Sequence, residues 1–324
     1  MARSVRTIDI AIFLGSAALL VAVLVLRSRE PTPATLPAQP RLTPLGAIPN
    51  GPTFLATVDL ARVRQSPLGA TLTESGRVLP GVGRLSDVCG FDPTSELDEL
   101  AFAIPKRDST DFGLVGTGHF AAKQMAECAS AIVAKRHGKP GLTQVGSFVT
   151  VRDLNGSAGE IAVRDGGPVM LGDGHYLRDM IDTAEGRLDN VSRDKTHESL
   201  RASVGDGALV ASWVVPPGWL ERVTDSNLVR LSPLSSLRAA ALRVNVAPKV
   251  SALAVLGCSS EAACADLAGV LDSLRKDLAP LIRRELGDDP FAAAKISVAG
   301  RVVRVEMELA PTRAAAILLR LMQR

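Results

Sequence analysis

An unbroken run of 17 apolar or small residues near the amino terminus constrains this chain more than any other feature. The run extends from Ile10 to Leu26, and it covers 19 residues when Ile8 and Asp9 are included. A helix of this length rises about 26 to 29 Å, close to the thickness of a bilayer's hydrocarbon core. A signal peptide has a shorter apolar stretch that ends at small residues, whereas this run continues directly into Arg27. We expect an uncleaved transmembrane signal anchor over residues 8–26, after a tail of residues 1–7, with a cleaved signal peptide as the alternative.

The segment after the anchor is rich in proline. Residues 27–51 contain six prolines, which predicts an extended, semi-rigid stalk. Arginines flank the apolar run on both sides, so the positive-inside rule does not decide its orientation. A short tail, a span and a large domain are the usual arrangement of an exported domain. We therefore expect residues 52–324 on the periplasmic side of a bacterial inner membrane.

Charge is unevenly distributed along the chain. The whole sequence has 37 basic and 34 acidic residues, a net charge of +3. Residues 1–51 hold five arginines against Asp9 and Glu30, which accounts for all of the excess, so the remaining part is neutral. A neutral domain gives no electrostatic basis for binding nucleic acid.

Four cysteines indicate disulfides if the domain reaches an oxidising compartment. Cys258 ends an apolar, strand-like run and Cys264 lies near the start of the next helix, so these two residues are the first choice for a bridge. Cys89 and Cys128 then remain by elimination. The alternative is that Cys128 is a small buried hydrophobe on a helix face. No C-x-x-C motif occurs and the histidines lack ligand spacing, so we expect no metal site.

The periodicity of the apolar residues predicts an α+β fold. Alternating apolar residues indicate strands, for example at 208–215, 237–246, 250–257 and 301–309. Single apolar stripes indicate helices at about 121–137, 260–286 and 311–323. Pro280 predicts a kink or break in the second of these helices. Such elements suit antiparallel sheets that are covered by helices on one side. The order of elements is similar before and after residue 190. We therefore expect two similar α+β halves, 52–190 and 191–324, and an internal repeat.

Motifs for catalysis are absent. Gly116-x-Gly118-x-x-Ala121 resembles a dinucleotide-binding turn, but no carboxylate follows at the required distance. Carboxylates at Glu96, Asp98 and Glu99 are expected at helix starts or turns, where they need no catalytic role. We predict no catalytic, cofactor-binding or metal-binding residue. A surface site at His119, His175 and Trp219 is the remaining possibility, because both histidines follow glycine-rich turns and Trp219 follows two prolines.

Several features occur together in one known class of protein. The anchor, the proline-rich stalk, the segment GlyProThrPheLeuAlaThrValAspLeu, the segment CysGlyPheAspPro and a strand that ends in Leu-Gly-Cys resemble bacterial single-pass membrane-anchored extracytoplasmic proteins of unassigned function. The expected function is a non-catalytic envelope protein that binds a partner protein or an apolar ligand. The alternatives are a membrane-tethered hydrolase and a carrier of lipid or lipoprotein acyl chains.

Overall fold

The structure is a computed structural model that describes residues 43–67, 69, 84–106, 111–156, 159–218, 229–287 and 289–322. The expected anchor, most of the expected stalk and Trp219 lie outside these residues. Within the described ranges, no helix is both long enough and apolar enough to cross a membrane. The chain divides into two compact units, which we name the N-terminal unit (residues 43–64 and 84–198) and the C-terminal unit (mainly residues 199–322).

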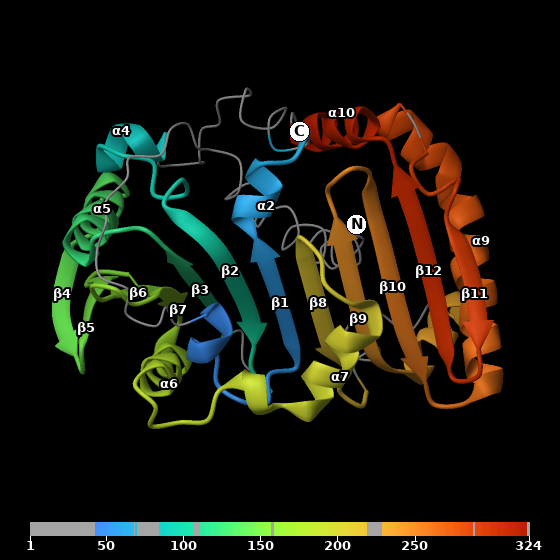
Figure 1. Cartoon of the computed structure of the whole chain (residues 1–324), viewed down its shortest axis with the longest axis horizontal. Helices are drawn as coiled ribbons and strands as arrows, with labels where there is room; N and C mark the ends of the chain where they lie inside the picture. Colours follow the sequence, from blue (N-terminus) through green and yellow to red (C-terminus); the bar gives the residue numbers. More distant parts are fainter. Residues whose placement is uncertain are drawn as a thin grey trace, which may run out of the picture. The chain divides into compact units, whose positions relative to one another are not determined.

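The N-terminal unit contains an antiparallel sheet, drawn in blue to green in Figure 1. Its strands follow the order β1-β2-β3-β7-β6-β5-β4. Their bounds are β1 (Phe54–Asp59), β2 (Leu97–Ile104), β3 (Gly113–Gly118), β4 (Pro140–Val145), β5 (Phe148–Asp153), β6 (Glu160–Val163) and β7 (Val169–Gly172).

Helices cover both faces of this sheet, whereas the sequence analysis expected helices on one side. The helices are α2 (Leu60–Arg64), α4 (Leu85–Cys89), α5 (Ala122–Lys135) and α6 (Gly174–Ala184). Ala162 of β6 packs in the core beneath α6, and its neighbour Val163 packs in the core beneath α5. Successive strand residues point to opposite faces, so α5 and α6 lie on opposite sides. The one-sided prediction was wrong because β5, β6 and β7 carry apolar residues on both faces.

The core of the N-terminal unit begins before residue 52, inside the segment expected to be the stalk. Residues Pro44–Ala47 form a short 3-10 helix, η1. Ala47 and Ile48 are fully buried against the α6 side of the sheet. Pro49 forms a β-bridge with Asn190, which precedes the 3-10 helix η2 (Val191–Arg193). The last prolines of the expected stalk therefore belong to the folded unit.

The C-terminal unit contains antiparallel strands in the order β11-β12-β10-β9-β8. Its strands are β8 (Leu209–Val214), β9 (Leu237–Asn245), β10 (Val250–Cys258), β11 (Lys295–Ala299) and β12 (Val302–Leu309). Its helices are α7 (Lys195–Val204), which begins just before the unit, η3 (Val229–Ser236), α9 (Glu261–Leu286) and α10 (Pro311–Met322). β8, β9, β10, β12, α9 and α10 match the predicted ranges to within two residues, whereas the sequence analysis predicted no range for α7 or η3.

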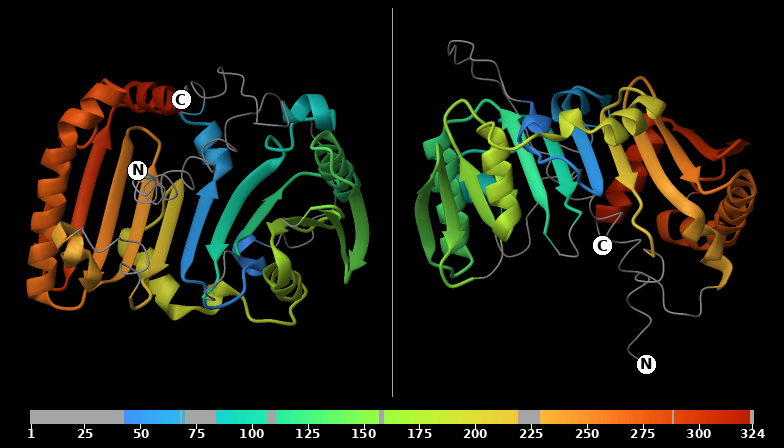
Figure 2. Two further views of the ribbon diagram at one scale, coloured as in Figure 1. Left: turned by 180° about the vertical axis from the view of Figure 1, so that it is seen from behind. Right: turned by 90° about the horizontal axis from the view of Figure 1, so that it is seen from below.

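The two long faces of the C-terminal sheet are also both covered. Leu267 of α9 packs with Val303 on one face, and Val204 of α7 packs with Val255 on the other. The right view of Figure 2 shows α9 against its face of the sheet. Ser260 caps α9 by accepting a hydrogen bond from the Ala263 N–H at 3.1 Å. The helix continues through Pro280, so the predicted break does not occur.

The two units share a topological pattern in the part of the chain that the structure describes. In each unit a helix follows the third strand, and further strands follow that helix. The last of these further strands pairs with the third strand of its unit: β7 pairs with β3, and β12 pairs with β10. Four strands follow the helix in the N-terminal unit, but two follow it in the C-terminal unit. An internal duplication therefore stays a prediction. The boundary between the units falls after Glu198 instead of after residue 190.

Candidate functional site

Three strand ends meet at one end of the N-terminal sheet and bring four ionisable side chains together. In antiparallel neighbours, the end of one strand lies beside the start of the next. Asp59 at the end of β1 therefore lies opposite Glu99 at the start of β2, and β3 ends beside Leu97. His119 directly follows β3. We name Asp59, Asp98, Glu99 and His119 the strand-end cluster.

Asp98 is the centre of this cluster. Its Oδ2 lies 3.0 Å from His119 Nδ1, and its Oδ1 lies 3.2 Å from Arg64 Nη2. Arg64 also donates a hydrogen bond to the Leu97 carbonyl, which fixes α2 to the start of β2. The sequence analysis placed Asp98 at a helix start or turn, but it lies on a strand. The pattern did not reveal β2 this early because polar residues occupy its first positions.

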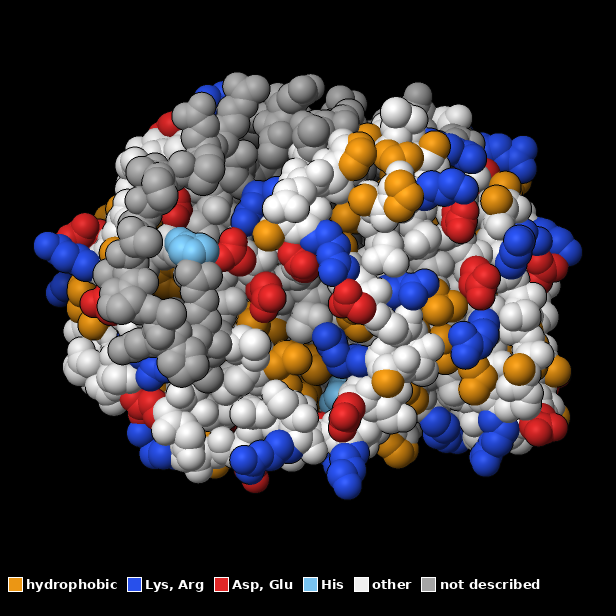
Figure 3. Space-filling model, in the orientation of Figure 1, with side chains coloured by type: hydrophobic (Ala, Val, Ile, Leu, Met, Phe, Trp, Pro, Cys, Tyr) orange, Lys and Arg blue, Asp and Glu red, His pale blue; other side chains and the backbone are white. Residues whose placement is uncertain are grey.

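Glu99 lies beside two other carboxylates of the strand-end cluster. Partial desolvation at the sheet end raises the pKa of the Glu99 carboxyl, and the charges of Asp59 and Asp98 raise that pKa further. Asp59 is itself partly neutralised, because its Oδ2 lies 3.5 Å from Arg62 Nε. Acidic and basic side chains are likewise interspersed over the face seen in Figure 3. Arg62 and Arg64 therefore offset two of the three carboxylates, which is typical of a structural network.

A close backbone approach sets the position of His119. The His119 N–H donates to the Glu96 carbonyl at 2.7 Å. A Cβ on Gly118 would lie 1.8 Å from the same oxygen, so only glycine fits this position. A Cβ on Gly116 would press on Leu97 at 2.9 Å. Strand packing thus explains the two glycines that resembled a dinucleotide-binding turn.

The strand-end cluster has one element of catalytic geometry. A carboxylate 3.0 Å from an imidazole can orient the ring and stabilise its protonated form. The His119 side chain is 55% exposed, however, and Asp98 is shared with Arg64. A half-open cavity of about 310 Å³ is lined by Arg152, Asp153, Glu160 and Asp173 with Leu154 and three glycines, and it contains no member of the cluster. The His119 imidazole is thus more than half exposed to solvent and lies outside this cavity.

His175 does not join His119, because it follows β7, whose end pairs with the start of β3, whereas His119 follows the end of β3. His175 lies in the first turn of α6 and is exposed. It follows Gly174, which lines the cavity. Trp219 lies outside the described residues. Within the described ranges, no group of three His, Cys, Asp or Glu side chains could hold a metal ion.

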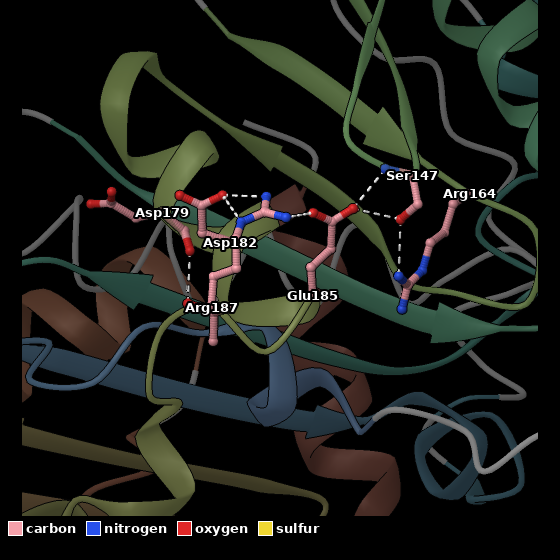
Figure 4. A network of polar contacts seen from close by, with 7 residues as sticks. Ser147, Arg164, Asp179, Asp182, Glu185 and Arg187 are labelled. Atoms are coloured by element: carbon pink, nitrogen blue, oxygen red, sulfur yellow. Dashed lines mark hydrogen bonds and ion pairs between the residues drawn. The ribbon is translucent and has the colours of Figure 1, made fainter.

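A second polar network joins the β4–β5 turn to the end of α6 (Figure 4). Glu185 Oε1 accepts hydrogen bonds from the Ser147 N–H at 2.6 Å and from the Ser147 hydroxyl at 2.7 Å. Arg187 forms an ion pair with Glu185 and donates from Nε to Asp182 at 2.9 Å. Hydrogen bonds from the Ser147 N–H and hydroxyl, together with Arg187, lower the pKa of Glu185. The lowered pKa makes Glu185 a weaker base, and Arg164 Nη1 donates to the Ser147 hydroxyl oxygen at 3.1 Å, so this network fastens a hairpin and does not activate a nucleophile.

Both units contain a disulfide. Cys89 of α4 is bonded to Cys128 of α5, and Cys258 at the end of β10 is bonded to Cys264 in the first turn of α9. These are the two pairs that the sequence analysis chose. Among the described residues no cysteine is free. The disulfides support an oxidising compartment for both units.

Four large apolar side chains of the C-terminal unit are exposed. Leu278 and Leu281 on α9, Phe291 after it and Val298 on β11 are 43 to 46% exposed. Arg275 Nη1 on α9 donates to the carbonyls of Ala292 and Ala294 at 3.2 Å, so the segment that carries Phe291 runs beside α9 and leads into β11. Val298 lies toward the other end of β11, where its partner Val303 packs with Leu267 in the first half of α9. We name Leu278, Leu281 and Phe291 the apolar border.

The length of α9 explains the apolar border. The helix has 26 residues and the neighbouring strand β12 has eight. These numbers correspond to about 39 Å of helix and about 26 Å of strand, so the last turns of α9 extend past the sheet. The sequence analysis assigned Leu278 and Leu281 to the buried stripe. A comparison of predicted helix and strand lengths would have identified them as exposed.

Comparisons with known proteins give the fold alone. No protein-family model matches this chain, and no curated protein matches it with significance. The chain is similar in structure to crystal form III of TP0453, with a TM-score of 0.52 at 14% identity over 86% of this chain and 98% of that chain. Crystal form I of TP0453 gives a TM-score of 0.45 at 14% identity over 86% of this chain and 96% of that chain. The first similarity supports an α+β fold with antiparallel sheet and helices.

Proposed function

We propose that this chain is a non-catalytic, membrane-anchored extracytoplasmic protein of the bacterial envelope, and that it binds a partner protein through the apolar border. The border is the observation that carries the proposal. Large apolar side chains that are exposed together favour association, because contact with a partner removes them from water. Each fully covered side chain of this size contributes about 1.5 to 3 kcal/mol.

The extracytoplasmic location rests on two independent features. The apolar run at residues 8–26 has the length of a membrane span. The disulfides Cys89–Cys128 and Cys258–Cys264 use all four cysteines of the chain, as is usual for a domain in an oxidising compartment.

Site-specific photo-crosslinking in intact cells tests the partner. A photoreactive phenylalanine analogue replaces Leu281 in the full chain, and the matched control carries it at Leu142, which is 60% exposed in the N-terminal unit. We expect an adduct of one discrete mass from position 281 and none from position 142. Equal labelling from both positions, or none from position 281, would contradict the proposal. A membrane-impermeant thiol reagent on reduced intact cells checks the location, because cytoplasmic cysteines would stay unlabelled.

A membrane-tethered hydrolase is the second candidate, and the contact between His119 and Asp98 is the observation that favours it. In that case a hydrolytic activity of the purified chain would fall by a factor of about 100 or more in His119→Ala, since general base catalysis contributes about 10² to 10⁴. His175→Ala, in which the changed side chain is exposed, is the control. The carrier alternative has less support, because the described cavity of about 310 Å³ is lined mainly by charged residues and glycines.

A further inference from the structure

β11 forms an edge of the C-terminal strands that, within the described residues, is protected only by its short length and one lysine. β11 is the terminal strand of the order β11-β12-β10-β9-β8. Edge strands generally avoid new pairing through proline, bulges or several charges. β11 has the sequence LysIleSerValAla, with one charge and no proline, and its register with β12 is regular. Four of its five residues are exposed, and only Ile296 is half-buried.

The hairpin geometry determines which backbone groups face the open edge. β11 and β12 are joined by a two-residue turn with Gly300 at a positive φ of 57°, and Ala299 pairs with Val302 across it. A two-residue turn closes on a hydrogen-bonded pair, and such pairs alternate with non-bonded pairs along an antiparallel ladder. The N–H and C=O groups of Ile296 and Val298 are therefore directed away from β12, toward the open edge.

Val298 demonstrates that α9 leaves this edge accessible. Its partner on β12 is Val303, which is fully buried beneath α9, so the Val298 side chain is on the same face of the sheet as α9. Val298 is nevertheless 43% exposed. The helix therefore does not cover this end of β11, and an apolar side chain from an added strand has room to pack there.

We infer that the partner at this edge is a second copy of the chain, whose β11 pairs antiparallel with the first β11 about a two-fold axis at Ser297. This inference goes beyond the proposed function, because the β11 edge is a surface separate from the apolar border. In this register Ile296 stands opposite Val298 of the second copy, and the same pair recurs on the other side of the axis. Both residues present outward backbone groups, so the two pairs supply four hydrogen bonds between the copies.

The side chains are also self-complementary in this register. On the α9 face, Ile296 meets Val298 of the second copy, an apolar pair that covers the exposed Val298 side chain. On the other face, serine meets serine at the axis and Lys295 stands opposite Ala299 of the second copy, so no like charges are opposed. The edge strand β4 of the N-terminal unit is less suited, because Pro140 at its start lacks an N–H.

Cysteine cross-linking of the full chain in its membrane tests this register. In the proposed dimer, Ser297 faces itself at a Cα–Cα distance of about 4.5 Å, which permits a disulfide. Ala299 is exposed on the same face, but its two copies are separated by about 13 Å, since four residues of strand lie between them. With mild oxidation, we expect Ser297→Cys to give about tenfold more disulfide-linked dimer than Ala299→Cys. Equal yields from both variants, or none from Ser297→Cys, would refute the register.

A second change removes the pairing without removing the cross-linking residue. Val298→Pro deletes an outward N–H that β12 does not use, so Ser297→Cys with Val298→Pro should fold and lose the dimer. Val298→Lys, which places like charges near the axis, should also lose it. Circular dichroism checks that each variant is folded. A persisting dimer in both folded variants would overturn the inference. A photo-adduct from position 281 with a different protein, combined with no dimer of Ser297→Cys, would refute the second copy and leave the proposed function intact.

Discussion

Loss of the Cys89–Cys128 disulfide should destabilise the chain about twice as much as loss of Cys258–Cys264. The first bridge closes a loop of 39 residues and the second closes a loop of six. If a cross-link acts by restricting the unfolded chain, the loop-closure relation gives about 4 kcal/mol for the long loop and about 2 kcal/mol for the short one. Helix α4 has no buried residue. The disulfide between α4 and α5 therefore contributes a large share of what holds α4 in place.

The two units can be followed separately during urea unfolding of the full chain in detergent. Both tryptophans, Trp213 and Trp219, belong to the C-terminal half of the sequence, so fluorescence reports on that half, whereas circular dichroism reports on both. We expect Cys89→Ala with Cys128→Ala to shift the dichroism midpoint of the N-terminal unit by about 2 M, taking a slope near 2 kcal/mol per M. The fluorescence midpoint should not change. The double alanine variant of Cys258 and Cys264 should shift fluorescence by about half as much.

The comparison between the two variants tests the physical reasoning. Equal losses from both pairs, or a larger loss from the short loop, would mean that native-state packing dominates over restriction of the unfolded chain. Cys264 is fully buried, so a packing effect of this kind would be largest in the C-terminal unit. Reduction of the unmodified chain provides the matching control, because it removes both bridges without changing side-chain volume.

Three other substitutions give further predictions. Gly118→Ala should cost about 2 to 4 kcal/mol of unfolding free energy, because its Cβ would overlap the Glu96 carbonyl. Gly269→Ala on α9 meets nothing within 4 Å and should stabilise the chain by up to about 1 kcal/mol. Urea unfolding measures both changes, and an unchanged stability of Gly118→Ala would refute the close approach. Glu185→Gln should cost about 1 kcal/mol at neutral pH, because the amide accepts the Ser147 hydrogen bonds less strongly and the site is partly solvated. Since the pKa of Glu185 is lowered in the folded state, its contribution is complete above its ordinary value of 4.5 and is lost as the pH falls through the lower folded value. Stability measured from pH 7 to pH 3 should therefore fall less in Glu185→Gln than in the unchanged chain, and parallel curves would contradict the assignment.

Elements with strong periodicity could be predicted from the sequence. The helix expected at 260–286 is observed at Glu261–Leu286, and the final strand expected at 301–309 is observed at Val302–Leu309. Both have a regular apolar stripe and a clear terminator, with Gly287 ending α9 in the left-handed conformation. Local interactions determine these bounds, so a single sequence suffices to find them.

Features that depend on long-range contacts could not be predicted in the same way. Pro44–Ala47 appeared to belong to a stalk because its proline content is high, but contacts with α6 bury it in the core. The pairing of His119 with Asp98 depends on β3 returning beside β2, and no spacing in the sequence encodes that neighbour relation. Glycine-rich turns identified where the chain bends near His119 and His175 but not what each bend faces, and the surface site of His119, His175 and Trp219 stays a prediction.

The two candidate surfaces differ in whether their charged and hydrogen-bonding groups have partners within the chain. In the strand-end cluster, Asp98 has Arg64 and His119 as partners, and Asp59 has Arg62, so these charges need no external ligand. In the C-terminal unit, Val298 remains exposed and the outward groups of β11 have no neighbouring strand in its sheet. Unused backbone groups beside apolar surface favour the addition of a strand, since pairing satisfies the groups and covers the surface in one step. This contrast is why an interaction role accounts for the structure better than catalysis at His119.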